Sequence, residues 1–341
     1  MRRALIVHSA GPGVTVQDLG RPGYLGYGLS RGGAADRLAL AEGAALLGQA
    51  AGMAALELAG MGGEFEATED MRIALTGAPM RASIDGTRLV WNASHRLPKG
   101  ARLSIGAAEA GNYGYLHMGG GIALPPLLGS SGTHLYAGLG DTVRPGDSLP
   151  IGPDGRKETG LKLDAVDRFG GGMVRIVPSL QTDLFANDEI ARFQATTFLR
   201  DARGNRMGVR LAPDGEGFKS KAGLSVLSEV IVPGDIQITG DGAPFVLLCE
   251  CQTTGGYPRI GSVLPADLPR VVQARPGETL RFTFVTLDDA VAIQTRDRDA
   301  RNALKKNLSA VIRDPATMAD LLSYQLISGV TAGHDPDWSE P

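Results

Sequence analysis

Glycine constrains this fold more than any other residue, since it makes up 48 of the 341 residues. That share is about twice the usual one of roughly 7%. The glycines show neither the three-residue period of collagen nor the serine-rich context of a flexible linker, so they predict many tight turns between short strands. We therefore expect a mainly β protein with a few helices.

Charge and hydropathy argue against several functional classes. The 34 basic and 37 acidic side chains give a net charge of −3, which predicts binding to neither nucleic acid nor an anionic membrane. No apolar run approaches the roughly 18 residues of a membrane span, and the basic N-terminus lacks the apolar core of a signal peptide. Cys249 and Cys251 share one face of a predicted strand and form no disulfide framework. The sequence thus predicts a cytoplasmic protein.

Two β-rich parts are expected on either side of a polar, glycine-rich segment. That segment, at 152–172, is the best candidate for a linker. We predict an N-terminal β domain at 1–155, a C-terminal β domain at 172–288 and a helical tail at 289–341.

Helices are expected at four places. The alanine- and leucine-rich segment from Ala35 to Leu47 has Asp36 near its start and Gly48 just after its end, which is the pattern of a capped helix. The other three helices are predicted at 188–196, 289–311 and 314–326. Apolar or alternating runs predict strands at 71–76, 102–105, 229–238, 245–251 and 279–285.

The sequence lacks the familiar catalytic motifs. It contains no P-loop, no dinucleotide-binding glycine fingerprint and no serine nucleophile elbow. Its five histidines are scattered without metal-ligand spacing, so we expect no metal site. The catalytic residues remain unassigned at this level, and any activity has to come from loops that meet in the fold.

The first of three polar, glycine-bearing clusters runs from Thr15 to Arg21 and continues from Arg31 to Arg37. It brings two aspartates, Asp18 and Asp36, near several arginines on flexible backbone. This composition suits binding of a carboxylate or phosphate. A capped loop with surface ion pairs explains the same residues equally well.

Two further clusters lie in the second half of the chain. Arg206 and Arg210 share a face if their segment is extended, although a solvated strand edge explains them equally well. The third cluster follows the most apolar strand and offers many hydrogen-bond donors on unobstructed backbone, which favours ligand binding over a plain connection. Its residues are Gln252, Thr253, Thr254, Gly255, Gly256 and Tyr257.

Eight segments of the chain form an ordered set of motifs: Thr15–Tyr24, Gly32–Arg37, Ile73–Ala78, Gly129–Thr133, Asn205–Leu211, Ser228–Glu229, Pro233–Ile238 and Gln252–Pro258. In this order they resemble the biotin-dependent carboxyltransferase-like family, which includes allophanate hydrolase subunit 2, KipA and the C subunit of 5-oxoprolinase. We include Gln237, from one of the motifs, among the predicted substrate-binding residues. The chain departs from the family at Glu250 and Cys251, where Asp-Arg is usual.

The resemblance implies two cyclophilin-like β-barrel domains, one in each half, followed here by the helical tail. It also implies a subunit of an ATP-dependent 5-oxoprolinase, which hydrolyses the cyclic amide 5-oxoproline to glutamate and is active only as a complex. The implied partners are a protein related to KipI and allophanate hydrolase subunit 1, and a lactam-utilisation subunit. ATP is used by the complex, and no cofactor is expected to be bound covalently to this chain.

Two alternatives remain open at this point. One is the carboxyltransferase subunit of a biotin-dependent urea or amide carboxylase, with biotin on a partner chain because no biotin-accepting Met-Lys motif occurs here. The other is a regulatory binding protein of the KipA type, which antagonises a kinase inhibitor.

Overall fold

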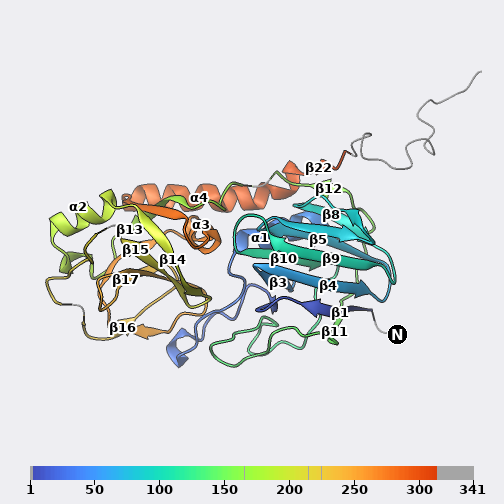
Figure 1. Cartoon of the computed structure of the whole chain (residues 1–341), viewed down its shortest axis with the longest axis horizontal. Helices are drawn as coiled ribbons and strands as arrows, with labels where there is room; N and C mark the ends of the chain where they lie inside the picture. Colours follow the sequence, from blue (N-terminus) through green and yellow to red (C-terminus); the bar gives the residue numbers. More distant parts are fainter. Residues whose placement is uncertain (1–2, 165, 214, 224, 313–341) are drawn as a thin grey trace, which may run out of the picture.

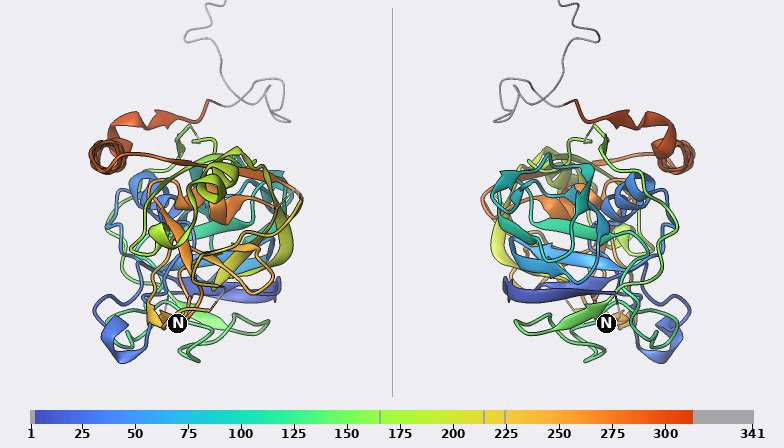
Figure 2. Two further views of the ribbon diagram at one scale, coloured as in Figure 1. Left: turned by 90° about the vertical axis from the view of Figure 1, so that its left-hand side faces the viewer. Right: turned by 90° about the vertical axis from the view of Figure 1, so that its right-hand side faces the viewer.

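The structure, a computed structural model, describes residues 3–164, 166–213, 215–223 and 225–312. Figure 1 shows two β-rich halves side by side, with α4 (Leu287–Ala303) crossing from one half to the other along one edge. The end views place this helix and the long loops at opposite edges (Figure 2). The prediction of a mainly β protein with a few helices is confirmed. The predicted helix at 314–326 lies outside the described residues.

The N-terminal half consists of two sheets that share one core. Their strand orders are β11-β1-β4-β9-β6-β7 and β2-β3-β10-β5-β8-β12-β22. Apolar side chains from both sheets, among them Leu5, Phe65, Leu56 and Leu116, pack into one buried cluster. In the described residues, the barrel implied for this half is therefore a pair of stacked sheets, because β1 bonds to β4 and β2 bonds to β3 in separate sheets.

The strands of this half are β1 (Ala4–Ala10), β2 (Thr15–Gln17), β3 (Ala55–Ala59), β4 (Met61–Ala67), β5 (Met71–Gly77), β6 (Met80–Ile84), β7 (Thr87–Arg88), β8 (Ala93–Leu97), β9 (Arg102–Ala108), β10 (Tyr113–Met118), β11 (Ser148–Pro150), β12 (Leu161–Lys162) and β22 (Ser309–Ala310).

The C-terminal half is a closed barrel with the strand order β13-β20-β17-β18-β15-β14-β21. Its first and last strands pair in parallel, which closes the barrel. Buried aromatic rings fill one end, where Phe193 lies 5.0 Å from Phe198 and 5.4 Å from Phe282 between ring centroids. The strands are β13 (Gly172–Val177), β14 (Phe198–Asn205), β15 (Gly208–Pro213), β17 (Asp235–Ile238), β18 (Pro244–Leu247), β20 (Arg259–Val263) and β21 (Thr279–Phe284).

The first two predicted helices are confirmed. Helix α1 (Arg37–Leu47) begins after Asp36, whose Oδ1 accepts hydrogen bonds from two backbone N–H groups of the first turn at 3.0 and 3.1 Å. It ends at Gly48, which has a φ of 63°. Helix α2 (Asn187–Ala195) lies within one residue of its predicted range. The structure adds a short helix, α3 (Leu268–Gln273), that the sequence patterns do not predict.

The chain returns to the N-terminal half after the barrel. Helix α4 ends at Ala303, well before the predicted end at Val311, and is followed by the 3₁₀ turn η3 (Leu304–Asn307) and by β22. The helix stops there because β22 pairs with β12, which lies within the predicted linker. The segment 152–172 is thus anchored to the sheet and also contributes the buried Arg168.

Two predicted strands differ from expectation. The run 229–238 forms two short strands, β16 (Glu229–Val230) and β17, which belong to different sheets. The apolar run 245–251 forms β18 only as far as Leu247, and Cys249 and Cys251 lie in the turn that follows. Both thiols are free and buried. The strand ends there because the chain turns toward the N-terminal half, where the Cys249 carbonyl accepts a hydrogen bond from the Gly32 N–H at 2.9 Å. Among the described helices, none combines the length and the apolar character needed to cross a membrane.

Candidate functional site

A buried ion network centred on Arg206 joins the two halves. Arg206 lies in the turn between β14 and β15, and its Nε donates to Glu250 Oε1 at 2.6 Å. Its two terminal nitrogens donate to Glu57 Oε1 and, at 2.5 Å, to the Gly33 carbonyl. Burial by itself lowers the pKa of Arg206, but the acidic groups Cys249, Glu57 and Glu250 raise it well above the usual value. This predicted binding residue is therefore a charged tie between the halves.

Glu57 extends the network to the start of α1. Its Oε2 accepts hydrogen bonds from the Tyr115 hydroxyl at 2.7 Å and from the Ala35 N–H at 2.8 Å. Burial, followed by the charge of Glu57, raises the pKa of Tyr115 well above its usual value. Sequence reasoning missed both residues, although Glu57 is the lone charge inside the otherwise apolar strand β3, and such a charge signals a buried partner.

Asp36 has a second role besides capping α1. Its Oδ2 accepts hydrogen bonds from Arg168 Nε at 2.7 Å and from Gln273 Nε2 at 2.8 Å. Arg168 also pairs with Glu42 at 2.8 Å. With both carboxylate oxygens of Asp36 engaged, this predicted binding residue fixes the position of α1 against the linker and α3.

The Gln17–Arg21 turn holds the matching motif Gly129–Thr133 in place. Asp18 Oδ1 accepts from Ser130 Oγ at 2.6 Å, and Arg21 donates to the Gly132 carbonyl. Two buried atoms of this turn, Gln17 Oε1 and Arg21 Nη1, have no partner among the described residues. Burial lowers the pKa of Arg21. The Gln17–Arg21 turn therefore mainly holds the 129–133 loop in shape. It leaves one acceptor, Gln17 Oε1, and one donor, Arg21 Nη1, without a partner in the described chain.

Arg210 lies apart from Arg206. It pairs with Asp201 at 3.1 Å and with Asp241, on the outer side of the barrel. The expectation that the two arginines share a face is wrong, because Arg206 lies in a turn and only Arg210 lies in the extended strand β15.

Three predicted residues meet in a small cavity at the end of the barrel, with a volume of about 260 Å³. We call it the amide pocket, because Gln237, Gln252 and Asn205 line it, together with Tyr257. Its apolar lining is Met207, Ile231, Phe245, Leu247 and Cys251.

Gln237 is the distinctive group of the amide pocket. Its side chain is 6% exposed, and its Nε2 has no hydrogen-bond partner among the described residues. A Cβ added at Gly255 would collide with this nitrogen, so glycine at 255 leaves room for it. Buried donors are normally satisfied, so this donor beside a cavity calls for an oxygen partner from outside the described chain.

The rest of the 252–257 loop shapes the rim of the amide pocket. Thr254 and Gly255 form β19 (Thr254–Gly255), which pairs with β16 (Glu229–Val230) in a separate ribbon. The Thr253 carbonyl accepts from the Ile231 N–H at 3.1 Å, and the Gly256 carbonyl accepts from the Val226 N–H at 2.8 Å. Thr254 itself is exposed to solvent.

The last predicted residue, Arg31, lies elsewhere. Its Nε donates to the Leu19 carbonyl at 2.8 Å, and its side chain lines a separate cavity between the halves, beneath α4. The structure therefore distributes the predicted site over four places: the amide pocket, the Gln17–Arg21 turn, the interface between the halves and, for Arg210, the outer side of the barrel. No three metal-ligating side chains gather anywhere in the described part of the chain.

The fold and the motifs define a carboxyltransferase-type protein. A family model described as carboxyltransferase domain, subdomain A and B, matches residues 27–284, and the chain belongs to this family.

Two relatives match over nearly their whole length. The chain is 35% identical to the C subunit of the 5-oxoprolinase of Escherichia coli, over 83% of this chain and 91% of that protein. It is 32% identical to the C subunit of the 5-oxoprolinase of Haemophilus influenzae, over 83% of this chain and 92% of that protein.

A solved structure shares the fold. The urea carboxylase of Kluyveromyces lactis matches 92% of this chain with a TM-score of 0.80 and 22% sequence identity. This chain spans only 31% of that longer protein.

Proposed function

We propose that this chain is a subunit of an ATP-dependent 5-oxoprolinase and that its amide pocket binds the lactam of 5-oxoproline. The near full-length similarity to two 5-oxoprolinase C subunits supports the first part. The unpaired Nε2 of Gln237 is the observation that supports the second part. A lactam offers the carbonyl oxygen that this donor lacks, and the apolar walls suit its ring methylenes.

The chemistry of the lactam explains why such a donor is useful. Amide resonance makes the ring carbonyl a poor electrophile, and the complex uses ATP to activate its oxygen so that water can attack the carbon. A fixed N–H at this oxygen stabilises the negative charge that develops there, and the loss of one such donor typically costs about 2.7–4 kcal/mol in the transition state. Gln237 is thus proposed as a substrate-binding residue, and the general base is left unassigned.

Activity is proposed to require partner subunits, among them one related to KipI. Support comes from exposed apolar side chains on three loops or short elements, among them β16, which lies at the bottom of Figure 1. Tyr27 of η1 (Leu25–Tyr27) is 86% exposed, Tyr136 57% and Val230 of β16 57%. Apolar side chains gathered around a functional loop are typical of a protein–protein interface.

The test is reconstitution of the complex followed by assay of ATP-dependent 5-oxoproline hydrolysis. The isolated chain should be inactive. Gln237→Met should lower kcat of the complex by roughly 100-fold. Its melting temperature should stay the same or rise, because the substitution removes an unsatisfied buried donor.

A matched control substitutes a glutamine whose amide is fully used. Gln49 donates to the Met118 carbonyl at 3.2 Å and accepts from the Gly120 N–H at 3.1 Å. Gln49→Met should therefore lower the melting temperature and leave kcat of the folded complex unchanged. Full activity of Gln237→Met would rule out the lactam site. Carboxylation of urea by the complex with a biotin carrier would instead favour the carboxyltransferase alternative.

A further inference from the structure

A cationic cavity lies between the two halves, beneath α4, with a volume of about 570 Å³. We call it the arginine pocket. Arg31 reaches it from the segment before α1, Arg37 from the first residue of α1, and Arg298 and Arg301 from α4. Apolar walls come from the barrel side: Pro233, Leu248, Pro265, Leu268 and Val272.

The positive charges of this pocket exceed what its own residues neutralise. Asp297 is the one acidic side chain among the described lining residues, and it pairs with Arg301 at 2.8 Å. Arg298 pairs at 3.2 Å with Asp299, which is not among the lining residues, so Arg31 and Arg37 carry the excess charge. The Arg37 guanidinium has no hydrogen bond or ion pair to any part of the chain that the structure describes. Burial and then the charge of Arg31 lower the pKa of Arg37 to about 10, as expected in an uncompensated positive field.

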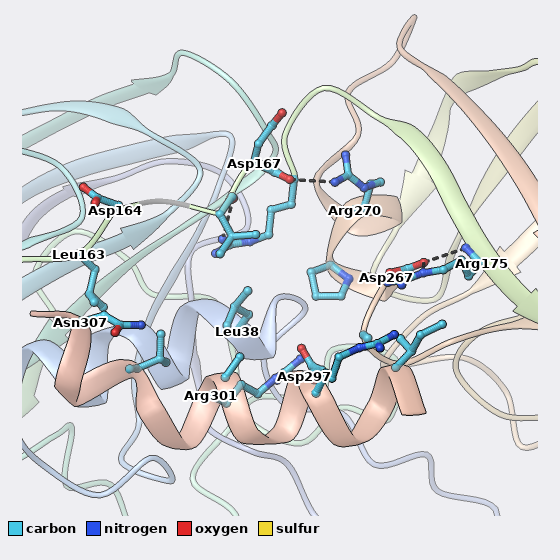
Figure 3. A pocket seen from close by; sticks show the side chains of 18 residues that line it. Leu38, Leu163, Asp164, Asp167, Arg175, Asp267, Arg270, Asp297, Arg301 and Asn307 are labelled. Carbon is cyan, nitrogen blue, oxygen red and sulfur yellow. Dashed lines mark hydrogen bonds and ion pairs between the residues drawn. The ribbon is translucent and has the colours of Figure 1, made fainter. Parts of the chain in front are cut away.

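A larger, adjoining cavity, which shares Asp297 and Arg301 of α4 with the arginine pocket, serves as an internal comparison (Figure 3). Its volume is about 790 Å³, and arginines line it too. There Arg175 pairs with Asp267 at 2.5 Å, and Arg270 donates to the Asp167 carbonyl at 2.8 Å. In that cavity the chain itself supplies oxygen partners for these two arginines, whereas Arg37 of the arginine pocket receives none from the described residues.

We propose that the arginine pocket binds a small organic anion, namely a carboxylate or phosphate group attached to an apolar body. Guanidinium groups bind both oxyanions through paired hydrogen bonds, and Arg37 has all of its guanidinium donors free of partners in the described chain. The apolar body lies against the wall formed by Leu248 and Leu268. The volume falls within the range of small-molecule sites. This site is separate from the proposed lactam site, since none of its arginines lines the amide pocket.

The test is calorimetric titration of the full chain with three probes of similar size. Benzoate and phenyl phosphate carry the two oxyanions, and benzamide is a neutral counterpart of benzoate. We expect saturable binding of at least one anion, with benzamide at least tenfold weaker. The tighter of the two anions identifies the oxyanion that the pocket prefers.

Variants locate the binding. Arg37→Met should weaken anion binding at least tenfold, and Arg31→Met provides a second test in case the first variant folds poorly. Arg296→Met, an exposed arginine of α4 that lines the other cavity, should change binding less than twofold. Equal affinity for benzamide and benzoate, binding of neither anion, or unchanged binding in folded Arg37→Met and Arg31→Met would overturn the proposal. None of these results bears on Gln237 or on lactam hydrolysis.

Discussion

Two arginines between the halves of this molecule differ in whether their guanidinium groups have partners. Arg206 contacts Glu57, Glu250 and a backbone carbonyl, whereas the Arg37 guanidinium has no hydrogen-bond partner among the described residues. A buried charge is costly unless it is paired, so the paired arginine belongs to the architecture. The unpaired one is available to a ligand. An arginine in a motif therefore does not by itself indicate a binding site. Whether its N–H groups are already bonded within the protein is the more informative observation.

The same contrast separates the two pockets that flank the turn after β18. Cys249 of this turn lines the arginine pocket, and Cys251 lines the amide pocket. One pocket presents an excess of positive charge, and the other presents the uncharged, unpaired amide of Gln237. A single short turn thus borders two sites suited to different ligands.

Removal of a partner from the paired arginine should have the largest effect on stability. Glu57→Ala leaves Arg206 and Tyr115 without a carboxylate that both contact in a buried interface. We expect the free energy of unfolding to fall by about 3–5 kcal/mol, measured by urea denaturation.

Substitution of the unpaired arginine should change the free energy of unfolding much less. Arg37→Met removes no side-chain hydrogen bond within the described chain, so its free energy of unfolding should change by less than about 0.5 kcal/mol. If both variants lost the same stability, the distinction between the two arginines would fail.

His117 is a buried base with no carboxylate partner among the described residues, and it should make the stability of the protein depend on pH. The His117 ring packs against Gly43 of α1, and burial lowers the pKa of His117 to about 3. The unfolded chain takes up a proton at this histidine as the pH falls below about 6.5, but the folded chain does not until about pH 3.

Stability should therefore decrease as the pH falls from about 6.5 toward 3, with His117 contributing up to about 1.4 kcal/mol per pH unit. His117→Gln should flatten this slope when unfolding is measured at several pH values. An unchanged slope would mean that the histidine is already charged in the folded protein.

The smallest expected effect concerns the thiols of the turn between the pockets. Burial raises the pKa of Cys249 to about 11 and that of Cys251 to about 12. At pH 8 a thiol-disulfide reagent should react with the native protein at least tenfold more slowly than with the unfolded chain, because little thiolate is present and access is restricted. Rapid labelling of Cys251 alone would show that the amide pocket is open to the reagent.

Much of the local structure could be predicted from the sequence. The start and the end of α1 follow from Asp36 and Gly48, and α2 lies within one residue of its predicted range, because caps and turns depend on neighbours in the chain. The end of α4 could not be predicted, since it depends on the pairing of β22 with a strand in another part of the chain.

The candidate site shows the same division. The motifs pointed to Gln237, Gln252 and Tyr257, and these three do line one pocket. The motifs also pointed to Asp36 and Arg206, whose side chains are engaged within the protein. Residue type and spacing could not separate the two groups, because both are polar residues in glycine-bearing segments.

The sequence by itself determined a β-rich chain of short strands, a capped α1 and polar loops that match a carboxyltransferase family. The tertiary structure decided which polar groups are satisfied. Arg206 meets Glu57 across 149 residues of sequence, and Gln273 meets Asp36 across 237. Pairing between residues so far apart in the sequence depends on how the two halves pack. Once such groups are buried, a missing partner costs free energy because water can no longer replace it. For this reason, only the folded chain distinguishes the arginine that joins its halves from the donors left free for ligands.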